Sequence, residues 1–383
     1  MKTGRVVASI TAMVSLVLPG AVRAQVSDLK AGSENVRLVR NFPYEGGTDI
    51  DFLGNFAYAG AQGSKGGIRV FNVAGKSPKE VAFIPCPGGQ NDVAMVKKGL
   101  LALGYHEGQC GKKVGGGVRL IDVKNPKRPK YLDDVNLPGG THTLTKYPGK
   151  PIMYASPGGL VNGGGIEQIL DVSNPRKIKV AATYKPHDVG CHDITFMFSN
   201  KGKIAFCPNL SGTEIWDVAD PLKPVLISRI TSPVQDFHHL AVPTPDGKYL
   251  VISDENFEAH ECVSGQSLTG AMYVWDITEL KAPILAGKYS PQRGAQPVGT
   301  LATSVCTSHN MNFIPGTRTL VSSWYTGGTS VIDFTDPLMP EEVAFYQPEN
   351  VNTWSSYWYR GRIYANDLAR GFDVLEAKGL KAR

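Results

Sequence analysis

One short pattern recurs along the chain and restricts its fold more than any other feature. Each copy is an apolar stretch that ends in Asp or a related residue, followed by a polar turn and a second apolar stretch. The acidic position is occupied by Asn72, Asp122, Asp171, Asp217, Asp276, Asp333 and, in a degenerate last copy, Glu376. These positions are 43 to 59 residues apart. Such a period fits a repeated unit of four short strands and their turns.

The turns inside the repeat have a consistent chemistry. Four copies place an Asn or Asp directly before proline, namely Asn125-Pro126, Asn174-Pro175, Asp220-Pro221 and Asp336-Pro337. The Asx side chain bonds to the turn backbone, and proline sets φ near its turn value. Helical periodicity is essentially absent, so each unit is expected to be a small antiparallel sheet.

Seven copies of the third strand predict an all-β, seven-bladed β-propeller with four antiparallel strands per blade. The last copy ends close to the C-terminus and lacks a fourth strand. The stretch from Val36 to Pro43 is similar to the fourth strands of other units. We therefore expect this N-terminal strand to close the last blade, which removes the open sheet edge.

The repeats resemble those of the LVIVD-repeat propeller family, which is named for its third strand. Leu120-Ile-Asp-Val123 and its relatives, followed by the Asn/Asp-Pro turn, carry the resemblance over roughly residues 36 to 377. The resemblance implies the propeller fold and an exported protein. It is weak for activity, because propellers host many unrelated functions.

The N-terminus predicts export. Lys2 and Arg5 precede an apolar stretch that is too short for a membrane span, and Val22-Arg23-Ala24 is typical of a cleavage site. We therefore expect residues 1–24 to be a signal peptide and residues 25–383 to be a single propeller domain, secreted or periplasmic. An uncleaved anchor is the alternative. No other segment predicts a membrane span, and a monomer is expected.

The formal net charge of +6 is mild for 383 residues, and the basic residues are scattered. This distribution disfavours a nucleic-acid partner.

Six cysteines follow the predicted signal peptide, an even number that suggests disulfides in an exported chain. The strand map pairs Cys191 with Cys207 across a hairpin and Cys86 with Cys110 within blade two. Cys262 and Cys306 remain as the third pair. Free, buried cysteines are the alternative.

The inner strands suggest a functional site. When their first residues are aligned, His142, His192, His238 and His309 occupy one position in blades three to six. Equivalent positions lie at one height around the channel, so these four imidazoles are predicted to meet at its mouth. A cluster of imidazoles without cysteine favours a transition metal, with Cu or Fe preferred and Zn or Mn as alternatives.

Residues near this position are expected to shape the site. Asp193, His239 and Asn310 come one step later, so their side chains are predicted to turn away from the channel and to orient the rings. The wall of a small-molecule pocket is expected from four further residues: Thr48, Asn91, Trp324 and Trp354.

Two loops near the same face contain acid–base groups. The candidates for catalysis are Asp254, Glu255, Glu258, His260 and His106. For the residues of the blade-five loop, a purely solvated loop is an equally good interpretation.

Two functions remain open. The first is a metal-dependent exported enzyme that acts on a small molecule, with an oxidoreductase favoured over a lyase or hydrolase. Its plan is similar to that of two groups of histidine-ring propellers, the carotenoid cleavage oxygenases, which hold iron, and the selenium-binding protein and methanethiol oxidase group, which is copper-associated. The second is a non-catalytic cell-envelope propeller that binds partners, in which the histidines are a structural or metal cluster. Metal-free acid–base use of the histidines is a further possibility.

Overall fold

The computed structural model describes residues 31–106, 108–110, 113–157, 165–187, 189–256, 270–291 and 305–380. The chain divides into two units, residues 1–30 and residues 31–383, and the first lies outside the described residues. The described part of the second unit consists of strands and loops, with no helix. No helix that is long and apolar enough to cross a membrane occurs among the described residues.

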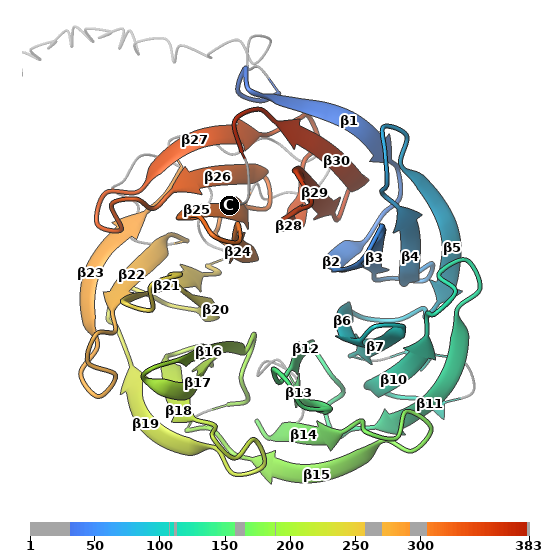
Figure 1. The fold of residues 1–383 in the computed structure, drawn as a ribbon, viewed down its shortest axis with the longest axis horizontal. Helices are drawn as coiled ribbons and strands as arrows, with labels where there is room; N and C mark the ends of the chain where they lie inside the picture. The colour runs from blue at the N-terminus through green and yellow to red at the C-terminus, as the bar shows by residue number, and fades with distance from the viewer. Residues whose placement is uncertain are drawn as a thin grey trace, which may run out of the picture. The chain divides into compact units, whose positions relative to one another are not determined.

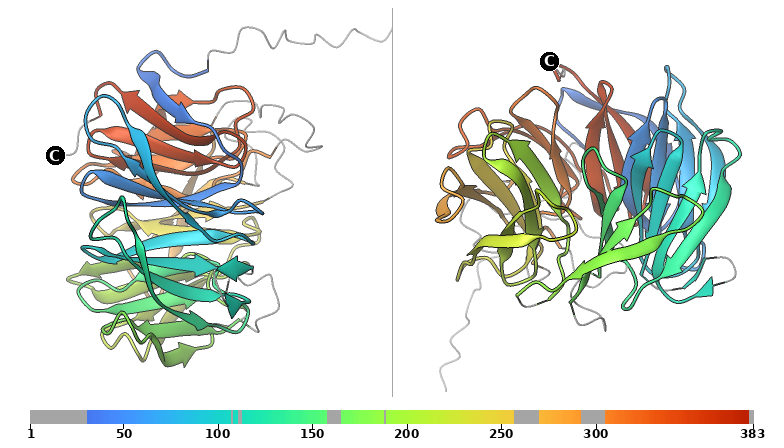
Figure 2. Two further views of the ribbon diagram at one scale, coloured as in Figure 1. Left: turned by 90° about the vertical axis from the view of Figure 1, so that its right-hand side faces the viewer. Right: turned by 60° about the horizontal axis from the view of Figure 1, so that its bottom comes forward.

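Seven four-stranded antiparallel sheets surround a central channel, which confirms the predicted propeller (Figures 1 and 2). In each blade the first strand named lines the channel and the last strand named is the outermost. Blades one to three are β2 (Gly47–Leu53), β3 (Phe56–Ala61), β4 (Gly67–Asn72) and β5 (Lys79–Pro85); β6 (Asn91–Lys97), β7 (Leu100–Tyr105), β10 (Gly117–Asp122) and β11 (Lys130–Asn136); and β12 (Thr143–Lys146), β13 (Ile152–Ser156), β14 (Glu167–Asp171) and β15 (Lys179–Tyr184).

The remaining blades follow the same order. Blades four to six are β16 (Thr195–Ser199), β17 (Gly202–Pro208), β18 (Thr213–Asp217) and β19 (Val225–Ile230); β20 (His238–Pro243), β21 (Tyr249–Asp254), β22 (Met272–Asp276) and β23 (Ile284–Tyr289); and β24 (Met311–Phe313), β25 (Thr319–Ser323), β26 (Thr329–Asp333) and β27 (Glu341–Tyr346). Blade seven is β28 (Thr353–Tyr359), β29 (Arg362–Asp367), β30 (Gly371–Ala377) and β1 (Val36–Phe42). A small additional hairpin in blade two pairs β8 (Gln109–Cys110) with β9 (Lys113–Val114).

The N-terminal strand closes the ring as predicted. β1 pairs antiparallel with β30 over six residue pairs, from Val36 with Ala377 to Phe42 with Phe372. The first and last described strands therefore share one sheet (Figure 1). The pairing covers the edge that β30 would otherwise expose.

The repeated acidic residue caps the turn after the third strand. In Asp122, Asp171, Asp217, Asp276 and Asp333, Oδ1 accepts a hydrogen bond from the backbone N–H two residues later, at 2.7–2.9 Å. The Asx residue before proline does the same, as in Asp220, whose Oδ1 accepts from Leu222 N. The sequence repeat is thus a repeat of Asx turns, which fixes where each third strand ends.

Neighbouring blades are joined near the channel by side chains of the inner strands. Asp51 Oδ2 accepts from Met95 N in the next blade, and Asp92 Oδ2 accepts from Leu144 N, each at 2.5 Å. Apolar residues of the middle strands fill the spaces between the blades. Leu101, Leu103 and Ile121, for example, pack with blade-one residues in one cluster. These contacts hold the inner-strand ends at fixed positions around the channel.

The structure brings together two of the predicted cysteine pairs. Cys86 lies with its Cα 4.5 Å from that of Cys110, and Cys191 lies 5.1 Å from Cys207. Both pairs are at disulfide distance. Cys306 is disulfide-bonded as well, while its expected partner Cys262 lies outside the described residues.

Candidate metal centre in the channel

A row of imidazoles follows the inner ends of blades two to six. The ring centroids of His106 and His142 are 5.7 Å apart, and those of His142 and His192 are 4.3 Å apart. His239 lies 4.1 Å from His192 on one side and 4.1 Å from His309 on the other. We call His142, His192, His239 and His309 the imidazole arc.

Three members of the imidazole arc were predicted, but blade five contributes His239 instead of His238. His238 turns away from the row, and its Nδ1 lies 2.9 Å from Thr213 Oγ1. Burial lowers the pKa of His238 to about 3, so this side chain is a neutral, hydrogen-bonded core residue. The expectation that His238 faces the channel is therefore wrong.

The error has a structural cause. In blade five the regular strand β20 begins at His238, so adjacent side chains point to opposite sides. His142, His192 and His309 each lie one to three residues before the first strand of their blade begins, where regular alternation does not apply. The four histidines are at equivalent positions, but the prediction gave them all the same side-chain direction. That direction differs between a residue inside a strand and a residue that precedes one.

The residues one step after the aligned histidines line a cavity at the channel centre, although their side chains were expected to turn away. The cavity has a volume of about 10 Å³, close to that of one water site, and is lined by Asp49, Gln90, Asp92, Thr143, Asp193, His239, His309, Asn310 and Trp354. All seven blades contribute their third aligned residue. Asp193, His239 and Asn310 are thus part of the cavity wall itself.

Glu255 connects the imidazole arc to blade six. Its Oε2 lies 3.5 Å from His239 Nε2, and its Oε1 lies 3.3 Å from His309 Nε2. Tyr325 Oη donates a hydrogen bond of 2.5 Å to the same Oε1. Burial alone would raise the pKa of Glu255, but the charge of His309 and these hydrogen bonds lower it below its ordinary value. Glu255 is therefore a buried carboxylate with three polar neighbours.

The two imidazoles beside Glu255 differ in their protonation. Burial, followed by the charge of His309, lowers the pKa of His239 well below its ordinary value, so His239 is neutral. For His309 burial also lowers the pKa, but Glu255 outweighs it and the pKa is raised. His309 Nδ1 lies 2.5 Å from the Trp354 carbonyl oxygen, which fixes Nδ1 as the donor and directs Nε2 at Glu255.

Tyr325 is a site residue that sequence analysis did not select. Its φ is +47°, a left-handed conformation that is uncommon for a bulky side chain. This conformation is observed together with a buried phenol on Glu255 and a ring 4.8 Å from that of His309. Sequence analysis chose the preceding Trp324, which packs in the core between blades five and six.

Asp193 lies between two members of the imidazole arc. Its Oδ2 is 3.1 Å from His192 Nδ1 and 3.4 Å from His239 Nε2. Two groups of donor atoms therefore share His239. One contains His192, Asp193 and His239, and the other contains His239, Glu255 and His309.

The opposite wall of the cavity is acidic, and we call Asp49 and Asp92 the acidic arc. Burial raises the pKa of Asp49 to about 7, although Tyr357 Oη donates a 2.7 Å hydrogen bond to it. Burial, together with the charges of Asp49 and Asp193, raises the pKa of Asp92 well above its ordinary value. Sequence analysis did not select either residue, although both stand at the aligned position after Thr48 and Asn91.

Other predicted site residues have structural roles. Asp254 accepts backbone hydrogen bonds from Asp236, Phe237 and Gly270, so it joins the approach to β20 to the residue before β22. Thr48 Oγ1 donates to the Asn91 carbonyl, and Asn91 Nδ2 donates to Ala61 and Cys86 carbonyls; neither residue lines the cavity. Of the four expected pocket residues, only Trp354 lines it. Glu258 and His260 lie outside the described residues.

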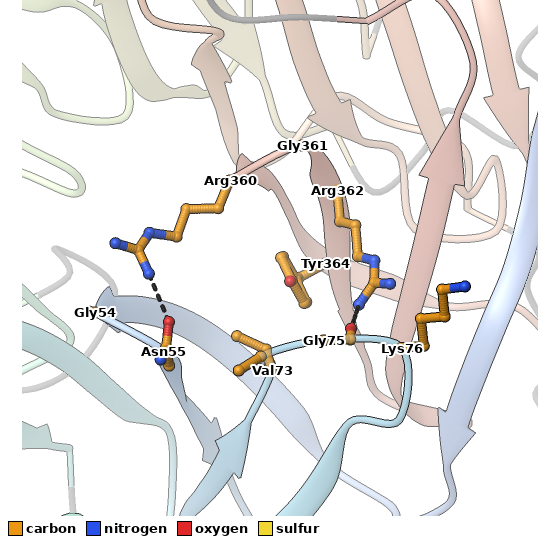
Figure 3. A pocket seen from close by; sticks show the side chains of 10 residues that line it. Gly54, Asn55, Val73, Gly75, Lys76, Arg360, Gly361, Arg362 and Tyr364 are labelled. Carbon is orange, nitrogen blue, oxygen red and sulfur yellow. Dashed lines mark hydrogen bonds between the residues drawn. The ribbon is translucent and has the colours of Figure 1, made fainter.

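A second depression lies between blades one and seven at the strand-turn face. It has a volume of about 440 Å³ and includes three basic residues, Lys76, Arg360 and Arg362 (Figure 3). Arg360 donates to Asn55 Oδ1, and Arg362 donates to the Gly75 carbonyl and to Glu376. Both guanidinium groups are thus engaged within the fold, and no carboxylate or imidazole lines this depression.

Comparison with known proteins supports the fold alone. No family model matches the chain, so the LVIVD-repeat resemblance and the similarity to histidine-ring metal propellers stay predictions, and no curated protein matches it. Among solved structures, a functionally unknown protein from Desulfotomaculum acetoxidans DSM 771 is similar, with a TM-score of 0.59 and 11% sequence identity. The match covers 80% of this chain and 87% of that protein. The chain is a seven-bladed β-propeller, and its candidate site has to be interpreted from its own residues.

Proposed function

We propose that the protein binds a divalent transition metal ion through His239, His309 and Glu255, and that it is an exported, metal-dependent enzyme acting on a small molecule. The observation that carries this proposal is the set of nitrogen–oxygen distances around Glu255. His239 Nε2 and His309 Nε2 lie 3.5 and 3.3 Å from its two carboxylate oxygens.

These distances suit coordination better than direct hydrogen bonding. A hydrogen bond between a charged imidazole and a carboxylate is about 2.7–2.9 Å long. Ligand atoms about 2.1 Å from one ion are roughly 3.0 Å apart at 90° and roughly 3.4 Å apart at the tetrahedral angle. The neutral His239 has an Nε2 lone pair that is free to bind a metal. At His309, Nδ1 stays on the Trp354 carbonyl, and a bound metal would replace the Nε2 proton that Glu255 stabilises.

The donor set favours iron over copper. Two imidazoles and one carboxylate with open positions are typical of non-haem iron(II) oxygenases, whereas the copper expectation rested on a set of histidines only. Manganese and zinc accept the same donors. Because the metal would supply Lewis acidity and redox chemistry, an oxidoreductase is the favoured class, ahead of a lyase or hydrolase.

Two features support an enzyme in place of a structural cluster. The cavity adjoins His239 and His309 and has room for about one water molecule, so a water or a single ligand atom can reach the proposed metal. The strained Tyr325 presents its phenol to the same carboxylate. Export is supported by the cysteine pairs at disulfide distance.

The metal proposal is tested by a matched pair of neighbouring histidines. Protein without the predicted signal peptide is stripped with a chelator, loaded anaerobically with Fe(II), desalted and measured by elemental analysis. We expect retained iron in wild type and in His238→Asn, and loss of iron in His239→Asn. Thermal unfolding of the three apo proteins checks that each is folded.

Oxidoreductase activity is tested separately by oxygen uptake of the iron-loaded protein with excess ascorbate as the electron donor. An oxidoreductase predicts oxygen consumption well beyond one equivalent per iron, and His239→Asn should abolish it. Retained metal that stabilises the fold without any oxygen uptake contradicts the oxidoreductase assignment. Absence of metal in wild type under every loading condition contradicts the proposal.

A further inference from the structure

A second group of donor atoms lies next to the proposed iron ligands. Asp193 Oδ2 is 3.1 Å from His192 Nδ1, and its side chain is 20% exposed while that of His192 is 5% exposed. The same oxygen is 3.4 Å from His239 Nε2. A carboxylate between two imidazoles is a common ligand arrangement, and Asp193 is placed to contact ions on both sides.

His142 continues this group. Its ring centroid is 4.3 Å from that of His192, at an interplanar angle of 76°. Its Nε2 is buried and has no hydrogen-bond partner within the described residues. An unsatisfied buried nitrogen is unfavourable, and a metal ion would satisfy it.

The cavity wall also supplies carboxylates besides Glu255. Asp49, Asp92 and Asp193 line the cavity, Glu255 lies beside it, and no Lys or Arg belongs to the described lining. Carboxylates and imidazoles gathered without a competing basic side chain are ligands that divalent transition metals accept.

We propose that the channel is a two-metal centre, in which a second divalent transition metal binds His142, His192 and Asp193, and Asp193 bridges to the ion held by His239, His309 and Glu255. This inference rests on the proposed function. Two-metal sites hold their ions about 3.5–4 Å apart and position one oxygen ligand between them. The substrate class would then be a small molecule that offers an oxygen atom to both ions.

The number of ions per chain tests this inference. Stripped protein is loaded with Mn(II), desalted and measured by elemental analysis and by electron paramagnetic resonance. We expect two ions per chain and the signal of a spin-coupled pair in wild type. His142→Gln and Asp193→Asn are each expected to retain one uncoupled ion. The surface variant His187→Ala serves as the control for adventitious imidazole binding and is expected to retain two.

The outcomes separate the two proposals. One ion per chain in wild type, unchanged in His142→Gln and Asp193→Asn, overturns the second site and leaves the first intact. Two uncoupled ions, one of them lost in His187→Ala, overturn it as well. No bound ion in wild type contradicts both proposals. Because Asp193→Asn is nearly isosteric, it keeps the test decisive if His142→Gln fails to fold.

Discussion

The imidazole arc and the acidic arc come from the same or adjacent positions of the repeat, yet they carry opposite chemistry. His239 and Asp92 are both third residues of aligned inner strands, and both line one cavity. Beside the imidazole arc, Glu255 is held ionised, with a pKa below its ordinary value. On the acidic arc, Asp49 has a pKa raised to about 7. The fold therefore supplies the positions, and the individual blades supply the chemistry.

The difference also predicts opposite pH effects on stability. Glu255 has a lowered folded-state pKa, so its contribution is present above its unfolded value and is lost as the pH falls. Asp49 has a raised folded-state pKa, so the folded chain binds the extra proton and stability falls as the pH rises from about 4 to about 7. The pH dependence of stability can thus test Glu255 and Asp49 separately.

The largest effect is expected when Glu255, the carboxylate beside the imidazole arc, is neutralised. Glu255→Gln should lower Fe(II) affinity by at least about 100-fold, because a charged ligand is replaced by a weak one. Competition with a chelator of known affinity measures the change. An affinity within threefold of wild type would show that Glu255 is not a ligand.

A smaller loss is expected from Tyr325→Phe, which removes only the hydrogen bond to Glu255. Partners that orient a ligand typically contribute 10–100-fold to metal affinity. We expect about a 10-fold loss in the same chelator competition, with unfolding of the apo protein little changed. A loss as large as that of Glu255→Gln would instead indicate that the phenol itself binds the metal.

On the acidic arc, Asp49→Asn should change the pH profile of stability. Between pH 4 and 7 the free energy of unfolding of wild-type apo protein should fall with a slope on the order of 1 kcal/mol per pH unit from this group. The Asn variant, which keeps an acceptor for Tyr357, should lack that component. Urea unfolding at several pH values in a chelator measures both slopes, and parallel profiles would contradict a raised pKa for Asp49.

The smallest effect is expected at the outer end of the imidazole row. His106 lies 5.7 Å from His142 and does not line the cavity. His106→Ala should change Fe(II) affinity by less than about threefold, measured as above. A larger loss would extend the metal centre beyond the imidazole arc and remove the contrast between the two arcs.

The sequence predicted the fold well because the repeat is local. Each Asx turn and each apolar strand can be recognised within a few residues, and the pairing of β1 with β30 followed from the missing fourth strand. The side-chain directions at the channel were harder to predict. They depend on whether a strand has already begun, as β20 has at His238, or begins after the histidine, as β24 does after His309.

Tyr325 and the acidic arc were missed for a different reason. Tyr325 contacts Glu255 from a left-handed backbone conformation. The neighbouring residues in the sequence do not predict that conformation. Asp49 and Asp92 stand at the same aligned position as Asp193 and His239, a position whose side chains were expected to turn away from the channel but line the cavity. Interactions between blades decide such positions, and no single repeat contains that information.

The central claim is that His239, His309 and Glu255 hold a transition metal, and anomalous diffraction tests it most directly. Crystals grown from iron-loaded protein would be measured at the iron absorption edge. The account predicts an anomalous peak about 2.1 Å from His239 Nε2, from His309 Nε2 and from a Glu255 carboxylate oxygen. An iron-loaded crystal whose anomalous peaks lie only at surface side chains such as His187 would contradict it.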